Sequence, residues 1–362
     1  MTAPKIVISG YYGFGNAGDE AMLSAIVRSV RTLYPGASIT AISGDPGKTA
    51  SIFHIHAVHR FSGPAILQAL WQSDLLISGG GSLLQDVTSS RSLFYYLSII
   101  MMALFLRKKV FLYAQGIGPV HRGWPRRLLA WVLNRVSAIT VRDESSKTFL
   151  ASIGVASDVT VTADSVLSLP QVSLEKGKAI LEEAGIDRTK GKVIGISVRS
   201  WQDGTSWAEE FHAYVKAMEE EGCQIVFIPM QYPDDAAAAE CIAAGTGENA
   251  HVLKRPLSVE DLMSVIGNVD LLIGVRLHAL IFAALMHTPF IGISYDPKID
   301  NFLHAIGEKA IFPISAFDGK TLYNKSRVMF HDGAGTAPWE AVDAMRRRAG
   351  ETVKVLARVM KE

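Results

Sequence analysis

The amino-acid sequence predicts an α/β protein made of two doubly wound domains, each built on a parallel sheet. Short apolar runs alternate with amphipathic stretches of helical periodicity along almost the whole chain. These runs are apolar on both faces, which is typical of buried parallel strands and not of half-exposed antiparallel ones. A chain of 362 residues also exceeds what one hydrophobic core usually supports, so two domains are expected.

The chain opens with a predicted strand at Lys5–Gly10, a glycine-rich loop at Tyr11–Glu20 and a helix at Glu20–Leu33. This order of strand, glycine loop and helix is typical of phosphate-binding sites. However, the glycines at positions 10, 13, 15 and 18 are out of register with the dinucleotide-binding fingerprint, and the loop lacks the lysine of an ATP-binding P-loop. The sequence therefore argues against a nicotinamide cofactor and against an ATP site.

The remainder of the first half repeats the alternation, with a helix predicted at Pro64–Gln72. The further predicted strands are Ser38–Ser43, Ala57–Arg60, Asp74–Ser78, Lys109–Gln115, Ala138–Val141 and Val159–Thr162. We therefore expect residues 1–168 to form one doubly wound, Rossmann-like domain.

The second half restarts the pattern after a linker at residues 168–173, where Pro170 interrupts any helix. Its predicted strands are Lys192–Val198, Cys223–Pro229, His251–Lys254, Leu271–Gly274 and Phe290–Ser294, and its predicted helices are Leu174–Gly185, Ala208–Glu221, Ala236–Ala244, Ser258–Gly267 and Leu280–Met286. They predict a second Rossmann-like domain over residues 174–335. The segment 336–362 holds a basic amphipathic helix at Pro338–Lys361, which we expect to cross back to the first domain. Two such domains facing a cleft form a GT-B-like architecture.

The composition describes an ordinary globular chain, with 49% hydrophobic and 20% charged residues. Its 36 basic and 35 acidic side chains give a net charge of +1, so no nucleic-acid partner is expected. The cysteines, Cys223 and Cys241, are too few for a disulfide framework or a zinc site, and their apolar neighbours predict buried free thiols. The chain runs directly into a strand without a signal peptide, and we expect a cytoplasmic protein.

One apolar run has two interpretations. Leu93–Leu106 has no charged residue and is flanked by basic ones, but it is shorter than the roughly 20 residues that a membrane-spanning helix needs. It is either a core helix beneath the sheet or a helix that docks on a bilayer with its basic ends at the headgroups. His121–Arg135 repeats the combination of arginines, tryptophans and leucines.

Basic residues gather where strands of the second domain end. Arg276, Leu277 and His278 follow a buried strand and precede a helix that is apolar nearly all round. In open α/β sheets ligands bind at this edge, and the amino end of a helix adds partial positive charge. Lys298 and Arg199 also follow strands of this domain. The pattern suits an anionic substrate that needs a proton transfer, although a strand-end arginine can also serve only as the partner of a carboxylate and a histidine can be structural.

Candidate ligand-binding residues also follow strands of the first domain. Asn16 and Asp19 lie in the glycine-rich loop, where Asp19 either accepts a proton from a hydroxyl or only complements the helix dipole. Gly80 and Gly81 belong to a glycine triplet that lets a ligand approach the backbone closely or that forms a tight turn. Arg142 either binds an anion or forms an ion pair with the neighbouring acid.

Two further patterns are less specific. The segment Gln231–Asp235 fits a functional loop and a turn with a helix cap equally well. The ten histidines are scattered, and the sequence shows neither a metal-ligand pattern nor the Gly-x-Ser-x-Gly elbow of serine hydrolases. No metal or cofactor is therefore expected.

Together these segments resemble the polysaccharide pyruvyl transferase family over nearly the full length. The resemblance is carried by GYYGFGNAGDEAML, ISGGGSLLQD, YAQGIGP, TVRDESS, GISVR, FIPMQYPDD, GVRLHALIFA and GISYDPK. It implies a GT-B-like fold and transfer of the enolpyruvate-derived group of phosphoenolpyruvate to a sugar, which gives a pyruvate ketal and phosphate. Cell-wall members of the family act across O4 and O6 of N-acetylmannosamine in a lipid-linked precursor.

The resemblance also implies roles for individual residues. Arg142, Arg276 and Lys298 would hold the phosphate and carboxylate of the donor, His278 would be the general acid, and Asp19 would lie by the acceptor. The side chains suit this chemistry, because arginine binds phosphate and carboxylate in a bidentate manner and imidazole exchanges protons near neutral pH. The alternatives are a GT-B glycosyltransferase with a nucleotide-sugar donor and a binding module without catalysis. The oligomeric state is not predicted.

Overall fold

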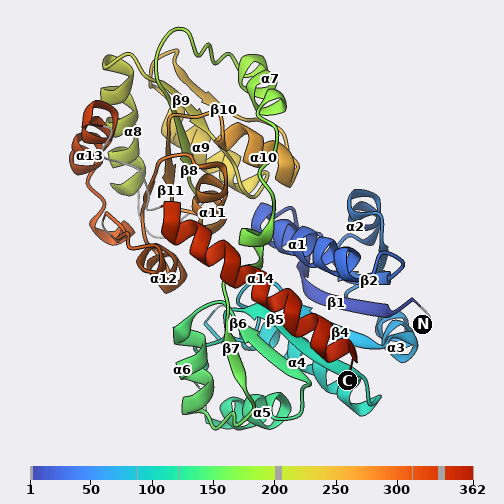
Figure 1. Ribbon diagram of the computed structural model, residues 1–362. Coiled ribbons are helices and arrows are strands. Elements are labelled where there is room, and N and C mark those ends of the chain that lie inside the picture. Colours follow the sequence, from blue (N-terminus) through green and yellow to red (C-terminus); the bar gives the residue numbers. More distant parts are fainter. Residues whose placement is uncertain are drawn as a thin grey trace. The chain divides into compact units, whose positions relative to one another are not determined.

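The computed structural model describes residues 3–361 except 88, 122, 200–205, 312 and 333–338. The chain separates into two compact units. Unit 1 comprises residues 1–169 and 345–362, and unit 2 comprises residues 170–344. The fold is α/β with two doubly wound, Rossmann-like sheets, one in each unit (Figure 1).

Unit 1 is built on a seven-stranded sheet in the order β3-β2-β1-β4-β5-β6-β7, in which every neighbouring pair is parallel. Its strands are β1 (Lys5–Tyr12), β2 (Ser38–Ser43), β3 (His56–His59), β4 (Leu75–Gly79), β5 (Lys109–Gln115), β6 (Ala138–Val141) and β7 (Val159–Val161). The central strand β4 is buried along its whole length, as its continuous apolar sequence predicts.

Helices cover both faces of this sheet. On one face, α1 (Ala17–Leu33), α2 (Pro46–Phe53) and the end of α14 (Trp339–Lys361) share a core with the strands. On the other face lie α3 (Gly63–Gln72), α4 (Ser90–Phe105), α5 (Gly123–Leu133) and α6 (Glu144–Ser152), which enclose a second core (Figure 1). The short helix η1 (Ser165–Ser168) contacts α1 and lies at the end of the first segment of the unit.

Unit 2 has a five-stranded parallel sheet in the order β10-β9-β8-β11-β12. Its strands are β8 (Val193–Ser197), β9 (Gln224–Phe227), β10 (Ala250–Val252), β11 (Leu271–Gly274) and β12 (Phe290–Gly292). One face packs against α8 (Ser206–Glu220), α9 (Asp234–Ala243) and α13 (Gly319–Asp332). The helices α7 (Glu175–Glu183), α10 (Val259–Ile266) and α11 (Leu277–Met286) pack together, and α12 (Pro297–Ala305) and η2 (Ile314–Ala316) follow β12.

The structure differs from the sequence prediction at the start of α1 and in several helices that were not predicted, α13 among them. Helix α1 starts at Ala17, before the predicted Glu20, because the side chain of Asn16 caps it. Helices α2, α6 and α12 were not predicted, and each begins after an aspartate whose carboxylate accepts a hydrogen bond from a backbone N–H of the first turn. The predicted residue Pro338 lies outside the described residues.

The two cysteines do not share one environment. Cys223 is buried, and burial raises the pKa of its thiol to about 11. Cys241 is free but exposed, so the expectation of a buried thiol is wrong there. It lies on α9, whose buried residues include Ala236, Ala239 and Ile242, so the apolar context did not place Cys241 itself on the buried face.

The apolar segment near residue 100 is largely a core helix. Helix α4 buries Leu93, Tyr96, Leu97, Ile99, Ile100 and Ala103 against the sheet and its neighbouring helices. Its outer side carries Ser98, Met101 and Phe105, which are exposed. Among the described residues, no helix combines the length and hydropathy that crossing a membrane requires.

Candidate functional site

Each sheet contains one point at which the strand order reverses, and most of the predicted site residues follow the strands that flank these points; Arg142 follows β6 and Lys298 follows β12. In unit 1 the reversal falls between β1 and β4, which are followed by the glycine-rich loop and the glycine triplet. In unit 2 it falls between β8 and β11, which are followed by Arg199 and by Arg276. Ligands of open α/β sheets bind outside the carboxyl ends of strands at such points. The topology therefore marks one candidate edge in each unit.

Arg276 forms a fork with a buried carboxylate. Its Nε donates to Oδ2 of Asp235 over 3.0 Å, and its Nη2 pairs with the other carboxylate oxygen. Asp235 is fully buried and also accepts hydrogen bonds from the backbone N–H groups of Met230 and Gln231. Burial raises the pKa of Asp235, while Arg276 acts in the opposite direction. Asp235 thus fixes the orientation of Arg276.

The amino end of α11 lies directly after Arg276 in the chain. Arg276 occupies the position before the helix but makes no capping hydrogen bond with its side chain. In contrast, Ser258 caps α10 and Asp296 caps α12 through their side chains. An amino end without a side-chain cap keeps backbone N–H groups available to an anion.

Leu277 and His278 begin this helix. The side chain of Leu277 is buried in the core, so its backbone N–H is the part that can contact a ligand. The side chain of His278 is half-buried one residue later, within the first turn. A backbone donor and an imidazole are therefore brought to the same helix end.

Two further cations share one aromatic ring. The guanidinium carbon of Arg199 lies 4.7 Å from the ring centre of Tyr295, and Nζ of Lys298 lies 5.3 Å from it. Lys298 also pairs with Asp296 over 3.2 Å. Arg199 follows β8 and Tyr295 follows β12, so Tyr295 holds together cations from two separate strands. The edge of unit 2 thus carries Arg199, Arg276 and Lys298.

The edge of unit 1 brings the glycine loop to the glycine triplet. Oδ1 of Asn16 accepts hydrogen bonds from the N–H groups of Gly18 and Asp19, so this predicted ligand-binding side chain also caps α1. Gly80 and Gly81 have positive φ angles of 91° and 60°. A Cβ added to Gly81 would lie 3.3 Å from Oδ1 of Asp19, which places this carboxylate beside the triplet.

Arg142 is engaged by protein groups on all three guanidinium nitrogens. It contacts Asp164 at 3.2 Å and Asp143 at 3.5 Å, and it donates to the hydroxyl of Ser82 over 3.0 Å. The ion pair with Asp143, left open by the sequence, is therefore present. Two carboxylates around one guanidinium give an anion less attraction than the edge of unit 2 does.

Sequence reasoning missed Arg60, which follows β3 in unit 1. Its guanidinium carbon lies 5.1 Å, 5.0 Å and 4.6 Å from the ring centres of Phe14, Phe61 and Tyr95. Phe14 itself stacks on Tyr11, with ring centres 4.2 Å apart. We name Arg60 with Tyr11, Phe14, Phe61 and Tyr95 the arginine–aromatic cluster. The strand-end position of Arg60 was a usable signal, but its rings come from three separate segments.

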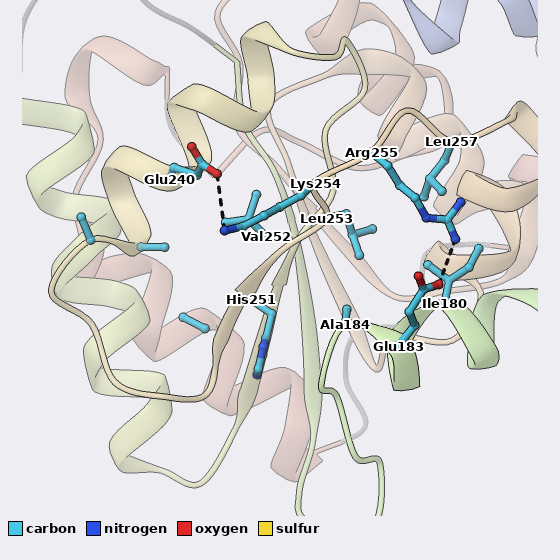
Figure 2. Close-up of a pocket in the computed structure, with 13 residues that line it drawn as sticks. Ile180, Glu183, Ala184, Glu240, His251, Val252, Leu253, Lys254, Arg255 and Leu257 are labelled. Carbon is cyan, nitrogen blue, oxygen red and sulfur yellow. Dashed lines mark hydrogen bonds and ion pairs between the residues drawn. The ribbon is translucent and has the colours of Figure 1, made fainter.

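A pocket of about 620 Å³ lies elsewhere in unit 2, beside the edge strand β10 (Figure 2). Its two cations already have carboxylate partners, because Lys254 pairs with Glu240 over 3.8 Å and Arg255 with Glu183 over 3.1 Å. Its lining includes no residue that the sequence predicts to bind substrate. In the described part of the chain, no three His, Cys, Asp or Glu side chains gather as metal ligands.

Comparison with known sequences identifies one family. The model of the family described as polysaccharide pyruvyl transferase matches residues 16–297. The amylovoran biosynthesis protein AmsJ of Erwinia amylovora is 22% identical over 410 aligned positions, which cover 97% of each chain. The similarity thus extends over both units.

Solved structures share the fold at low sequence identity. Staphylococcus aureus MnaA, determined with UDP, superposes with a TM-score of 0.69 at 12% identity and covers 99% of this chain and 98% of its own. Anabaena Alr3699/HepE with UDP-glucose gives a TM-score of 0.68 at 13% identity, with 99% of both chains covered. At such identities these similarities establish the GT-B-like fold and carry no information on the substrate.

Proposed function

The chain belongs to the polysaccharide pyruvyl transferase family, and from this premise we propose that it transfers the enolpyruvate-derived group of phosphoenolpyruvate to a sugar. It is a transferase of polysaccharide biosynthesis, as the similarity to AmsJ also indicates. The proposal concerns the donor, the acceptor and the residues that act on them.

The observation that carries the donor assignment is the cationic edge of unit 2. Arg199, Arg276 and Lys298 accompany the amino end of α11 at the point where the strand order reverses. Phosphoenolpyruvate has a phosphate of about −2 charge near neutral pH and a carboxylate. Guanidinium groups and backbone N–H groups at a helix end suit both anions. Arg142 remains a candidate for a supporting role, although its partners are two carboxylates.

The proposed reaction begins with protonation of the donor. His278 gives a proton to C3, which turns the methylene into a methyl group and makes C2 electrophilic. A sugar hydroxyl oxygen bonds to C2 while Asp19 takes its proton. The bond between C2 and the phosphate oxygen then breaks, and a second hydroxyl closes the ketal and loses its proton to the departing phosphate. General acid catalysis of the first step contributes about 10²–10⁴-fold.

We assign the acceptor to the edge of unit 1. Asp19 lies beside the glycine triplet, and the arginine–aromatic cluster offers exposed ring faces together with a guanidinium. Aromatic faces beside a few polar groups are typical of small-molecule sites. The proposed acceptor is N-acetylmannosamine with its O4 and O6 in a lipid-linked cell-wall precursor, modified in the cytoplasm at the inner face of the membrane. The proposed reaction uses no metal or cofactor.

Release of phosphate from phosphoenolpyruvate tests this function. The full chain is incubated with the donor and with a panel of glycosides that carry lipid-like aglycones, and phosphate and ketal product are measured. We expect stoichiometric phosphate and ketal with an N-acetylmannosamine glycoside. Turnover of a UDP-sugar in the absence of phosphoenolpyruvate would instead support the nucleotide-sugar alternative and exclude the proposed donor.

A further inference from the structure

One face of unit 1 has an unusual surface composition. The helices α3, α4 and α5, which lie side by side on the same face of the sheet, contain no aspartate or glutamate (Figure 1). Between Asp86 and Asp143 the chain has no acidic residue at all, while it has several arginines and lysines. The whole chain has a net charge of only +1, so this is a local excess of positive charge.

The same face exposes large aromatic side chains. Phe105 at the end of α4 is 87% exposed, Trp71 at the end of α3 is 68% exposed, and Trp124 and Trp131 of α5 are 60% and 50% exposed. A folded chain rarely leaves several such rings in water without a partner. We name this surface, marked by Trp71, Phe105, Trp124 and Trp131, the α3–α5 face.

Basic and aromatic groups are interleaved on this face. The guanidinium carbon of Arg135 lies 4.1 Å from the ring centre of Trp131. Nζ of Lys108 donates to the carbonyl oxygen of Trp71 over 2.7 Å, which brings the basic segment after α4 to the end of α3. Tryptophan rings and basic side chains are the groups that settle at the boundary between lipid headgroups and acyl chains.

We propose that the α3–α5 face docks on a bilayer that contains anionic phospholipid. The helices would lie flat in the headgroup region, with their buried sides still packed on the sheet and their outer rings inserted. Charge decides between this partner and a second copy of the chain. A symmetric dimer through this face would oppose the arginines and lysines of helices that contain no acidic residue, whereas anionic lipid neutralises them.

This inference extends the proposed function and rests on it, because a lipid-linked acceptor would be found at the membrane. The measurement itself needs no substrate. The full chain is sedimented with vesicles of phosphatidylcholine, with and without phosphatidylglycerol. We expect binding to the anionic vesicles only, and we expect it to weaken as salt is raised, because salt screens exposed charges.

Variants on the two faces of the same sheet locate the contact. Trp71→Ser with Phe105→Ser should reduce partitioning about tenfold or more, because each ring is a large apolar group that leaves water. Arg107→Glu with Arg127→Glu should reduce it at least as strongly. Ile52→Ser on α2 and Arg28→Glu on α1 change exposed side chains on the opposite face and should leave binding unchanged.

Several outcomes would overturn the proposal. One is the absence of vesicle binding, and another is equal loss of binding in the control variants. Loss in the charge variant without loss in the aromatic variant would indicate a general polyanion surface. Light scattering that shows a dimer dissociated by Trp71→Ser with Phe105→Ser would assign the face to a second copy.

Membrane docking and the proposed reaction can be disproved independently of each other. A wild-type chain that binds anionic vesicles but releases no phosphate from phosphoenolpyruvate would leave the membrane surface standing and remove the proposed reaction. Conversely, the aromatic variant should keep its full rate with a water-soluble acceptor glycoside. A loss of this rate would mean that Trp71 and Phe105 affect the catalytic unit itself and not docking.

Discussion

At the scale of residues, Arg276 and His278 lie close together in the sequence but have different surroundings. Arg276 is fixed through both Nε and Nη2 by the buried carboxylate of Asp235. His278 lies two residues further on, half-buried in the first turn of α11. A change at Arg276 therefore affects folding and donor binding together, because it also removes the partner of the buried Asp235.

His278→Ala should lower kcat at least about 100-fold, because general acid catalysis typically contributes 10²–10⁴-fold. Binding of phosphoenolpyruvate should persist and is measured as a thermal shift of the variant. His304→Ala, which alters an exposed histidine on α12 of the same unit, is the control and should keep the wild-type rate. A variant at 278 with near wild-type turnover would remove the assignment of the general acid.

Arg276→Lys should raise the KM for phosphoenolpyruvate about tenfold, since a point charge replaces a fork that binds phosphate in a bidentate manner. Arg276→Ala should raise it further but also destabilise the fold by about 3–5 kcal/mol, because the buried Asp235 loses its partner. Pairing Arg276→Gln with Asp235→Asn should recover much of this stability while the KM stays high. An unchanged donor KM in all three variants would exclude the phosphate role.

Sequence reasoning found the cations of the site but did not pair Arg276 with Asp235. Arg276 and His278 were identified because they follow an apolar strand, and this placement depends on local pattern alone. Asp235 lies 41 residues from Arg276, and the choice of that carboxylate depends on the order of strands in the sheet. Arg60 was missed for the same reason, because its rings belong to separate segments of the chain.

At the scale of elements, the loops that follow strands of unit 1 are held in place by backbone geometry and by helix caps. Gly80 and Gly81 both adopt positive φ angles, so the triplet forms a tight turn as well as a surface for a ligand. Asp143 caps α6 while it contacts Arg142. Both features can be tested against matched positions in the same unit.

Gly81→Ala should combine a backbone cost of about 1–2 kcal/mol for the left-handed conformation with displacement of Asp19. The added Cβ would lie 3.3 Å from Oδ1 of that carboxylate. Gly154→Ala is the matched control, because Gly154 also has a positive φ and a Cβ there meets no atom within 4 Å. Urea unfolding should show a similar loss for both, while acceptor turnover should fall only in Gly81→Ala. Equal turnover in the two variants would show that Asp19 does not act on the acceptor.

Asp143→Ala should destabilise the fold by about 1 kcal/mol at neutral pH through loss of the cap on α6. Burial alone would raise the pKa of Asp143, but hydrogen bonds from Ser146 and Ser145 and the charge of Arg142 lower it below its ordinary value of 3.8. A depressed pKa contributes stability above the unfolded-state value, and this contribution is lost as pH falls through the folded-state value.

The gap in unfolding free energy between wild type and Asp143→Ala should therefore stay constant down to about pH 4 and shrink only below it. Ser89→Ala removes the neutral hydroxyl cap of α4 and should show a gap without this pH dependence. A gap for Asp143→Ala that grows on acidification would contradict the sign of the shift.

The bounds of strands and helices were predicted best where the segment is a continuous apolar run. The strands β2, β5, β6 and β11 begin and end where the sequence predicts, because buried parallel strands are continuous apolar runs. The helices α2, α6 and α12 were missed because they are short and only partly apolar, and their main signal is the aspartate cap before them. The Asp296-Pro297 pair before α12 was a readable start signal.

At the scale of the whole molecule, each unit has its own sheet, its own cores and one reversal of strand order. The family membership and the GT-B-like fold describe the chain as a whole, whereas the proposed roles divide between units. The donor is assigned to unit 2, and the acceptor and the lipid surface are assigned to unit 1. A ligand that binds one unit should therefore slow amide hydrogen exchange mainly in that unit.

Phosphoenolpyruvate should protect amide hydrogens mainly at the first turn of α11. An anion held by the N–H groups of Leu277 and His278 slows their exchange, and a ligand at 100 times its Kd stabilises the bound state by about 2.7 kcal/mol. Hydrogen exchange of the full chain, followed by mass spectrometry of peptides, measures this directly. Residues 250–257, beside the separate pocket at β10, provide the control within the same unit and should exchange at an unchanged rate. Arg276→Lys should weaken the protection and His278→Ala should keep it. Protection confined to residues 250–257 would move the donor to the β10 pocket and overturn the assignment to α11.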